Sequence, residues 1–268
     1  MLTGDAMSRW IMPHNVTDAP VRLFCFPYAG GGASAYRRWI RESEGSVYAM
    51  QPPGRENRVR DPLRYSLTEW AAEAAEAVLT HTDRPYAFFG HSLGARVAFE
   101  TAREIRRRGG PLPAHIFVSG SPAPDHCEER PLHRLDDAAF TAELKRFSGT
   151  PAELLENADI MAFFLPILRA DFTVDETYAF QPEDPLPVPI TAFCGSEDRE
   201  ATPPQMRAWR NFTSADFALR LLPGDHFFLF RPENRLPEQL HAMLRQCACP
   251  LCCTPASPHP PADAAAGG

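Results

Sequence analysis

Residues 90–94 read Gly-His-Ser-Leu-Gly and form the pattern G-x-S-x-G around Ser92. The apolar run at 85–89 is typical of a buried strand, and residues 93–102 carry apolar side chains at helical spacing. Ser92 is therefore predicted at a tight turn from strand to helix, where the flanking glycines permit a sharp bend. This context favours a nucleophilic serine over a serine that only caps a helix.

A nucleophilic serine needs a histidine to take its proton and a carboxylate to orient that histidine. In serine hydrolases with this turn, the chain order is serine, acid, histidine, and the last two follow late strands. Asp198 follows the apolar run at 190–195, and His226 follows the run at 217–222. We therefore expect Ser92, Asp198 and His226 to form a catalytic triad.

Neighbouring residues offer alternative bases and acids. His91 adjoins the serine but points elsewhere on a tight turn, and His241 lies in the last expected helix, so neither is favoured as the base. Glu197 and Asp225 adjoin the favoured acid and base, but neighbours on a turn or strand project in different directions. The spacing G-x-x-D favours Asp198 as the acid.

The oxyanion of a tetrahedral intermediate needs hydrogen-bond donors. The backbone N–H of Leu93 lies at a helix start, directly after the serine. The second donor is expected in the turn after the first strand, where the glycines at 30–31 let the backbone approach closely. We select the N–H of Ala29.

Two features resemble cofactor or metal sites. Gly30, Gly32 and Ala35 form an imperfect dinucleotide-binding pattern, but the second strand, which ends at 50–52, lacks the acidic residue that a ribose would need. The four cysteines within 247–253 do not have the spacing of the usual zinc sites. We expect neither a cofactor nor a metal ion.

The whole chain is typical of one globular domain, with 268 residues, 44% hydrophobic and 23% charged. A net charge of −7 argues against a nucleic-acid partner. No apolar run is long enough to cross a membrane, and residues 1–20 lack the apolar core of a signal peptide. A cytoplasmic protein is expected.

Strands and helices are expected to alternate along much of the chain, which predicts an α/β fold with a mostly parallel sheet covered on both faces. The expected strands are 21–26, 47–50, 85–89, 115–119, 190–195 and 217–222. The expected helices are 34–41, 67–80, 93–103, 203–211 and 237–246.

The segment at about 121–189 has no good strand, and helices are expected there at 136–147, 152–157 and 159–178, the last interrupted at Pro166. We interpret this segment as a helical lid over a binding channel, with complete packing into the core as an equal alternative. Candidates for the channel wall are Tyr28, Phe163, Phe164 and Phe227.

The chain is thus divided into an N-terminal arm (1–20), a domain (21–246) and a tail rich in Cys, Pro and Ala (247–268). The composition of the tail predicts disorder, because it cannot bury enough apolar surface to become ordered.

Four motifs together resemble those of the type II thioesterases of polyketide and nonribosomal peptide synthesis: 26–31, 51–56, 90–95 and 224–229. The likeness runs from about residue 21 to 246. It implies an α/β-hydrolase fold with a mobile helical lid. It also implies hydrolysis of acyl groups from the phosphopantetheine arm of acyl or peptidyl carrier proteins, which clears stalled or wrongly primed chains.

A carrier protein is acidic, so arginines at the channel mouth are candidates for its docking. We consider Arg55, Arg58 and Arg64 for this role, against the simpler interpretation of solvated surface charge. Two other functions remain open: an esterase or lipase that acts on free oxygen esters, and a binding protein of the same fold without turnover.

Overall fold

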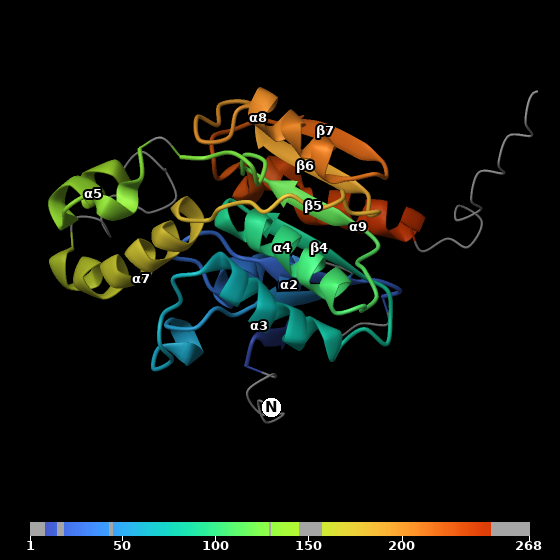
Figure 1. Cartoon of the computed structure of the whole chain (residues 1–268), viewed down its shortest axis with the longest axis horizontal. Helices are drawn as coiled ribbons and strands as arrows, with labels where there is room; N and C mark the ends of the chain where they lie inside the picture. Colours follow the sequence, from blue (N-terminus) through green and yellow to red (C-terminus); the bar gives the residue numbers. More distant parts are fainter. Residues whose placement is uncertain (1–8, 15–18, 43–44, 129, 145–156, 248–268) are drawn as a thin grey trace, which may run out of the picture.

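The protein is built on a seven-stranded sheet (Figure 1). The structure is a computed structural model that describes residues 9–14, 19–42, 45–128, 130–144 and 157–247. The strands are β1 (Ile11–His14), β2 (Arg22–Phe26), β3 (Ser46–Met50), β4 (Tyr86–His91), β5 (Ile116–Ser119), β6 (Ile190–Gly195) and β7 (Phe217–Leu222). Their order is β1-β3-β2-β4-β5-β6-β7, and every pair except β1 with β3 is parallel. The expected α/β fold with a mostly parallel sheet is confirmed.

Helices cover both faces of the sheet: α2 (Arg37–Glu42), α3 (Leu67–Leu79), α4 (Leu93–Arg107), α8 (Pro203–Arg207) and α9 (Leu236–Cys247). Alternate residues of a strand point to opposite faces. Phe24 of β2 accordingly packs in one apolar cluster with Trp70 of α3, whereas Cys25 packs in a second cluster with Trp39 of α2. Burial on both faces explains why the strands from β2 to β6 are apolar almost throughout.

The expected N-terminal arm contributes an edge strand that the sequence analysis missed. β1 pairs antiparallel with β3, with Ile11 opposite Met50 and His14 opposite Val47. Pro13 is tolerated there because an edge strand leaves one row of backbone groups unpaired. At least residues 11–14 therefore belong to the sheet. The tail at 248–268 lies outside the described residues.

A helical insertion separates β5 from β6, and its described residues form η3 (Leu132–Arg134), α5 (Asp137–Leu144) and α7 (Ala158–Glu176). Figure 1 shows α5 and α7 together at one side of the sheet. Their buried apolar side chains form a small core separate from the two that flank the sheet: Leu132, Phe140, Leu144, Met161 and Leu168. The helix expected at 152–157 lies outside the described residues, except for Asn157, which caps α7.

The expectation that Pro166 interrupts the last helix of this insertion is wrong, because α7 continues through it. A proline inside a helix deprives the carbonyl four residues earlier of its N–H donor. Here both Pro166 and Ala162, which carries that carbonyl, are exposed. Water can therefore satisfy the carbonyl, and the helix persists.

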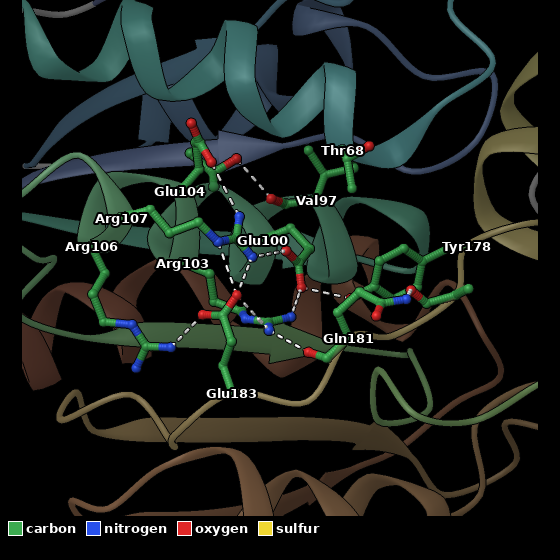
Figure 2. Close-up of polar contacts among 12 residues, drawn as sticks. Thr68, Val97, Glu100, Arg103, Glu104, Arg106, Arg107, Tyr178, Gln181 and Glu183 are labelled. Carbon is green, nitrogen blue, oxygen red and sulfur yellow. Dashed lines mark hydrogen bonds and ion pairs between the residues drawn. The ribbon is translucent and has the colours of Figure 1, made fainter.

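Hydrogen bonds and ion pairs connect the chain segment after α7 to helix α4 (Figure 2). We call the residues that make them the Glu100 cluster: Glu100, Arg103, Arg106, Arg107, Tyr178 and Glu183. Tyr178 donates a hydrogen bond of 2.6 Å to Glu100 Oε1, and Arg103 makes an ion pair with the same carboxylate. Glu183 accepts from Arg106 at 2.7 Å and from Arg107 at 2.6 Å. The segment after α7 is thereby anchored on the helix that begins at the nucleophile turn.

Acid is expected to destabilise the protein through His115, which lies just before β5. Its ring stacks on Phe117 with centroids 4.3 Å apart, and its Nε2 lies 2.9 Å from Thr191 Oγ1. Burial, with a contribution from Arg220, lowers the pKa of His115 to about 4. Below pH ~6.5 the unfolded chain binds a proton that the native state does not, so stability falls until the pH reaches about 4.

The full effect of this histidine is about 3 kcal/mol or less, because each pKa unit corresponds to about 1.4 kcal/mol. Urea unfolding at pH 7 and pH ~4.5 measures it, with His115→Asn as the comparison. The variant is expected to lose about 2 kcal/mol less stability than the parent on acidification. Equal losses in the two proteins would contradict the assignment.

Candidate active site

Ser92 lies at the expected strand-to-helix turn, between β4 and α4. Its backbone has φ 54° and ψ −127°, a conformation that costs energy for any residue but glycine. A Cβ on Gly90 would lie 2.2 Å from the carbonyl oxygen of Gly94, and a Cβ on Gly94 would lie 2.2 Å from that of Phe26. The turn thus requires both glycines of the motif.

Asp198 and His226 follow β6 and β7 and meet at the carboxyl edge of the sheet. His226 Nδ1 lies 3.0 Å from Asp198 Oδ2 and 3.2 Å from Oδ1. The backbone N–H groups of Glu200 and Ala201 donate to Asp198 Oδ1 at 2.9 and 3.2 Å. The carboxylate is therefore held in place, and it can fix the imidazole with Nδ1 protonated and Nε2 available as a base.

A cavity of about 680 Å³ opens beside these side chains, within the usual range of small-molecule sites. Ser92 and His226 both line it. Asp198 does not, since it lies behind His226, where an orienting carboxylate belongs.

Ala29 and Leu93, the expected oxyanion donors, both line the same cavity. Their strands are neighbours, with Phe26 of β2 opposite Gly90 of β4. Within the described residues, neither backbone N–H has a hydrogen-bond acceptor. Both are available to a ligand oxygen.

The alternative bases and acids lie elsewhere. His91 is fully buried, and His241 in α9 has its Nδ1 2.7 Å from the carbonyl oxygen of Pro237; neither lines the cavity. Glu197 is exposed, and Asp225 Oδ1 accepts from a backbone N–H two residues later in the chain. The geometry favours His226 and Asp198.

His91 nevertheless packs against His226. Its ring centroid lies 4.9 Å from that of His226, and its Nδ1 lies 3.0 Å from Ser119 Oγ. Burial, followed by the proximity of His226, holds the pKa of His91 well below 6.5. His91 therefore stays neutral and does not add a second positive charge when His226 takes up a proton.

Two of the four candidates for the channel wall line the cavity. Tyr28 and Phe227 do, and their rings pack edge to face with centroids 5.0 Å apart. Phe163 and Phe164 are 51% and 39% exposed and are not among the lining residues. Helix α7 instead contributes Leu168 and Phe172 to the wall.

The docking hypothesis is wrong for two of the three arginines. Arg55 is only 3% exposed and pairs with Asp171, and Arg58 is 6% exposed and donates to Asp61 at 2.8 Å. Arg64 is more exposed but donates to Glu73 at 2.7 Å. The expectation failed because the loop at 51–64 folds Arg55 and Arg58 inward onto acceptors, rather than out toward solvent.

Two charged residues near the site were missed in the sequence. Arg96 lies one helical turn after Ser92 and lines the cavity, and its Nη1 donates to Asp175 Oδ1 at 3.2 Å. Asp171 is fully buried in α7 and contacts the turn that carries Ala29. A lone acidic residue in an apolar helical stripe was the available signal, because a buried carboxylate requires partners.

The glycine-rich turn after β2 does not have the geometry of a dinucleotide site. Two of its N–H groups are bound by side chains of the protein: Gly30 donates to Asp171 at 2.7 Å, and Ala33 donates to Gln51 at 2.9 Å. A bound phosphate would have to displace these side chains. The alternative of cofactor binding is therefore disfavoured.

Among the described residues, no three His, Cys, Asp or Glu side chains are grouped so that they could hold a metal ion. Likewise, none of the described helices is both long and apolar enough to traverse a bilayer.

The sequence model of the thioesterase-domain family matches residues 21–246. "Linear gramicidin dehydrogenase LgrE" from Brevibacillus parabrevis is 45% identical over 242 residues, which cover 87% of this chain and 92% of that protein.

Solved structures are also similar to this chain. The "RedJ-Thioesterase from the Prodiginine biosynthetic pathway in Streptomyces coelicolor" has a TM-score of 0.79 and 40% identity, covering 86% of this chain and 88% of that one. "YbtT", a type II thioesterase from the yersiniabactin NRPS/PKS pathway, has a TM-score of 0.80 and 34% identity, covering 90% and 100%.

Proposed function

The chain belongs to the thioesterase family, and on this premise we propose that it hydrolyses acyl groups from the phosphopantetheine arm of acyl or peptidyl carrier proteins in polyketide or nonribosomal peptide synthesis. One observation carries the proposal: the Asp198–His226 hydrogen bond lies at the wall of the cavity that Ser92 also lines. Removal of stalled or wrongly primed chains is the biological task that fits this chemistry.

The reaction proceeds by double displacement. His226, oriented by Asp198, takes the hydroxyl proton of Ser92 as its oxygen attacks the thioester carbonyl. The pantetheine thiol leaves with that proton and an acyl-serine remains. Water then attacks the acyl-serine with His226 as the base, which releases the carboxylic acid and restores the serine.

Each tetrahedral intermediate carries a negative oxygen that needs two donors. The N–H groups of Leu93 and Ala29 serve this purpose, because both line the cavity and have no acceptor within the described chain. No cofactor takes part, since the phosphopantetheine belongs to the carrier.

The helical insertion acts as a lid that forms one wall of the acyl channel. Leu168 and Phe172 of α7 supply apolar surface to this wall, and Asp175 of α7, paired with Arg96 of α4, supplies charge. Chain length and polarity of the acyl group are selected at this wall, because the thiolate leaving group is the same in every substrate.

A comparison of two substrates tests the proposal. The same acyl group is presented on a carrier protein, followed by intact mass, and as a p-nitrophenyl oxygen ester. We expect kcat/KM to be at least about tenfold higher for the carrier thioester. The matched pantetheine thioester without the carrier isolates the contribution of protein docking. Preference for the oxygen ester would indicate a carboxylesterase instead.

A further inference from the structure

We propose that Asp171 of α7 is a positioning residue for the oxyanion hole and that it couples the helical insertion to the catalytic machinery. This inference rests on the proposed function. The carboxylate is fully buried and faces the turn at 28–31, which carries the Ala29 N–H. Asp171, the hydrogen-bond acceptor, belongs to the insertion, whereas Gly30, the donor, belongs to the sheet domain.

The first contact is direct. The N–H of Gly30 donates to Asp171 Oδ2 at 2.7 Å. Gly30 has φ +78°, and a Cβ there would lie 2.6 Å from Leu168 Cδ2. Leu168 precedes Asp171 by almost one helical turn, so one face of α7 both packs on this glycine and binds its N–H.

The second contact passes through Arg55. Its two Nη atoms donate to the two carboxylate oxygens of Asp171 at 2.5 and 2.7 Å, and Nη1 also donates to the carbonyl oxygen of Gly31 at 3.1 Å. The N–H of Gly31 in turn donates to the carbonyl oxygen of Tyr28 at 2.9 Å. The carboxylate therefore binds the N–H of Gly30, and the guanidinium binds the carbonyl of the next residue, Gly31.

The carbonyl of Tyr28 and the N–H of Ala29 belong to the same planar trans peptide unit, so orienting the one orients the other in the opposite direction. Asp171 acts on this peptide plane through the two residues that follow it: it binds Gly30 directly and Gly31 through Arg55, and the N–H of Gly31 binds the carbonyl of Tyr28. A buried ion pair adds little net stability compared with apolar packing. Its specific contribution here is the direction of an oxyanion donor.

The test is Asp171→Ala, assayed with an acyl-pantetheine thioester. An oxyanion donor acts mainly in the transition state, so kcat is expected to fall about 10- to 100-fold while KM changes by less than about threefold. A trifluoromethyl ketone carrying the same acyl chain adds to Ser92 and places an oxyanion in the hole. Its affinity is expected to fall in proportion to kcat.

Arg55→Leu/Asp171→Leu provides a second variant in which no buried charge is left unpaired. It is expected to show the same loss of kcat and of ketone affinity. Asp137→Asn is the matched control, because Asp137 is an exposed acidic residue of the same insertion that pairs with Arg169. It is expected to retain parental kcat.

Parental kcat in both Asp171 variants would overturn the proposal, as would a loss of kcat with unchanged ketone affinity. Ser92→Ala, assayed in parallel, separates this failure from failure of the proposed function. If Ser92 is essential but the Asp171 variants are fully active, only the positioning role is wrong. If Ser92→Ala is active, the proposed function itself is wrong.

Discussion

Ser92→Ala is expected to lower kcat for hydrolysis of a carrier-bound acyl thioester by about 10⁴- to 10⁶-fold. Without the hydroxyl, no acyl-enzyme forms, and only attack by water within the cavity remains. The variant should still bind substrate, because the cavity wall is unchanged. Intact mass spectrometry of the carrier measures turnover, and a phosphonate that labels active serines measures the nucleophile.

Ser214→Ala is the matched control, since Ser214 is an exposed serine outside the cavity lining. It should retain parental turnover and phosphonate labelling. An undiminished rate in Ser92→Ala, or a parent protein that resists the phosphonate, would support the alternative of a binding protein without turnover.

Asp198→Asn is expected to lower kcat by about 10⁴-fold, the scale found when the acid of such a triad becomes an amide. The asparagine fits the same space, and its oxygen can still accept from Glu200 and Ala201. It can present its amide nitrogen to His226, which favours the tautomer with the proton on Nε2 and removes the base from Ser92. Steady-state kinetics at neutral pH measure the loss.

Asp225→Asn distinguishes the two acids that flank the base. Asp225 Oδ1 accepts from Phe227 N–H at 3.1 Å, and an asparagine can preserve that bond. Its kcat should stay within about threefold of the parent. A large loss in Asp225→Asn with an active Asp198→Asn would reverse the assignment.

Local sequence patterns predicted most of the sheet. Buried parallel strands are nearly continuous apolar runs, so the run at 190–195 coincides with β6. The run at 217–222 also coincides with β7, although the residues of this edge strand are half-buried or exposed. β1 carries no such signal, because it is short, contains Pro13 and lies at an edge. Its pairing with β3 depends on a contact between distant parts of the chain rather than on its own composition.

The catalytic residues were predictable because a local motif specifies them. The contacts that hold the motif in place were not predictable. The spacing of glycines about Ser92 reports local backbone geometry. The pairing of Arg55 with Asp171 joins residues 116 positions apart, and nothing in either neighbourhood indicates the other. Arg55 was therefore predicted at the surface, although its side chain is buried.

The attachment of the helical insertion has a consequence for how acyl preference can diverge. β5 and β6 are paired and parallel, so the insertion leaves the sheet after Ser119 at its carboxyl edge and returns to the amino edge, where β6 begins at Ile190. Doubling the length of such a loop costs only about 0.6 kcal/mol in closure entropy. The insertion can thus be lengthened, shortened or replaced with little loss in the stability of the sheet, provided that its contacts through Asp171 and Glu183 are kept.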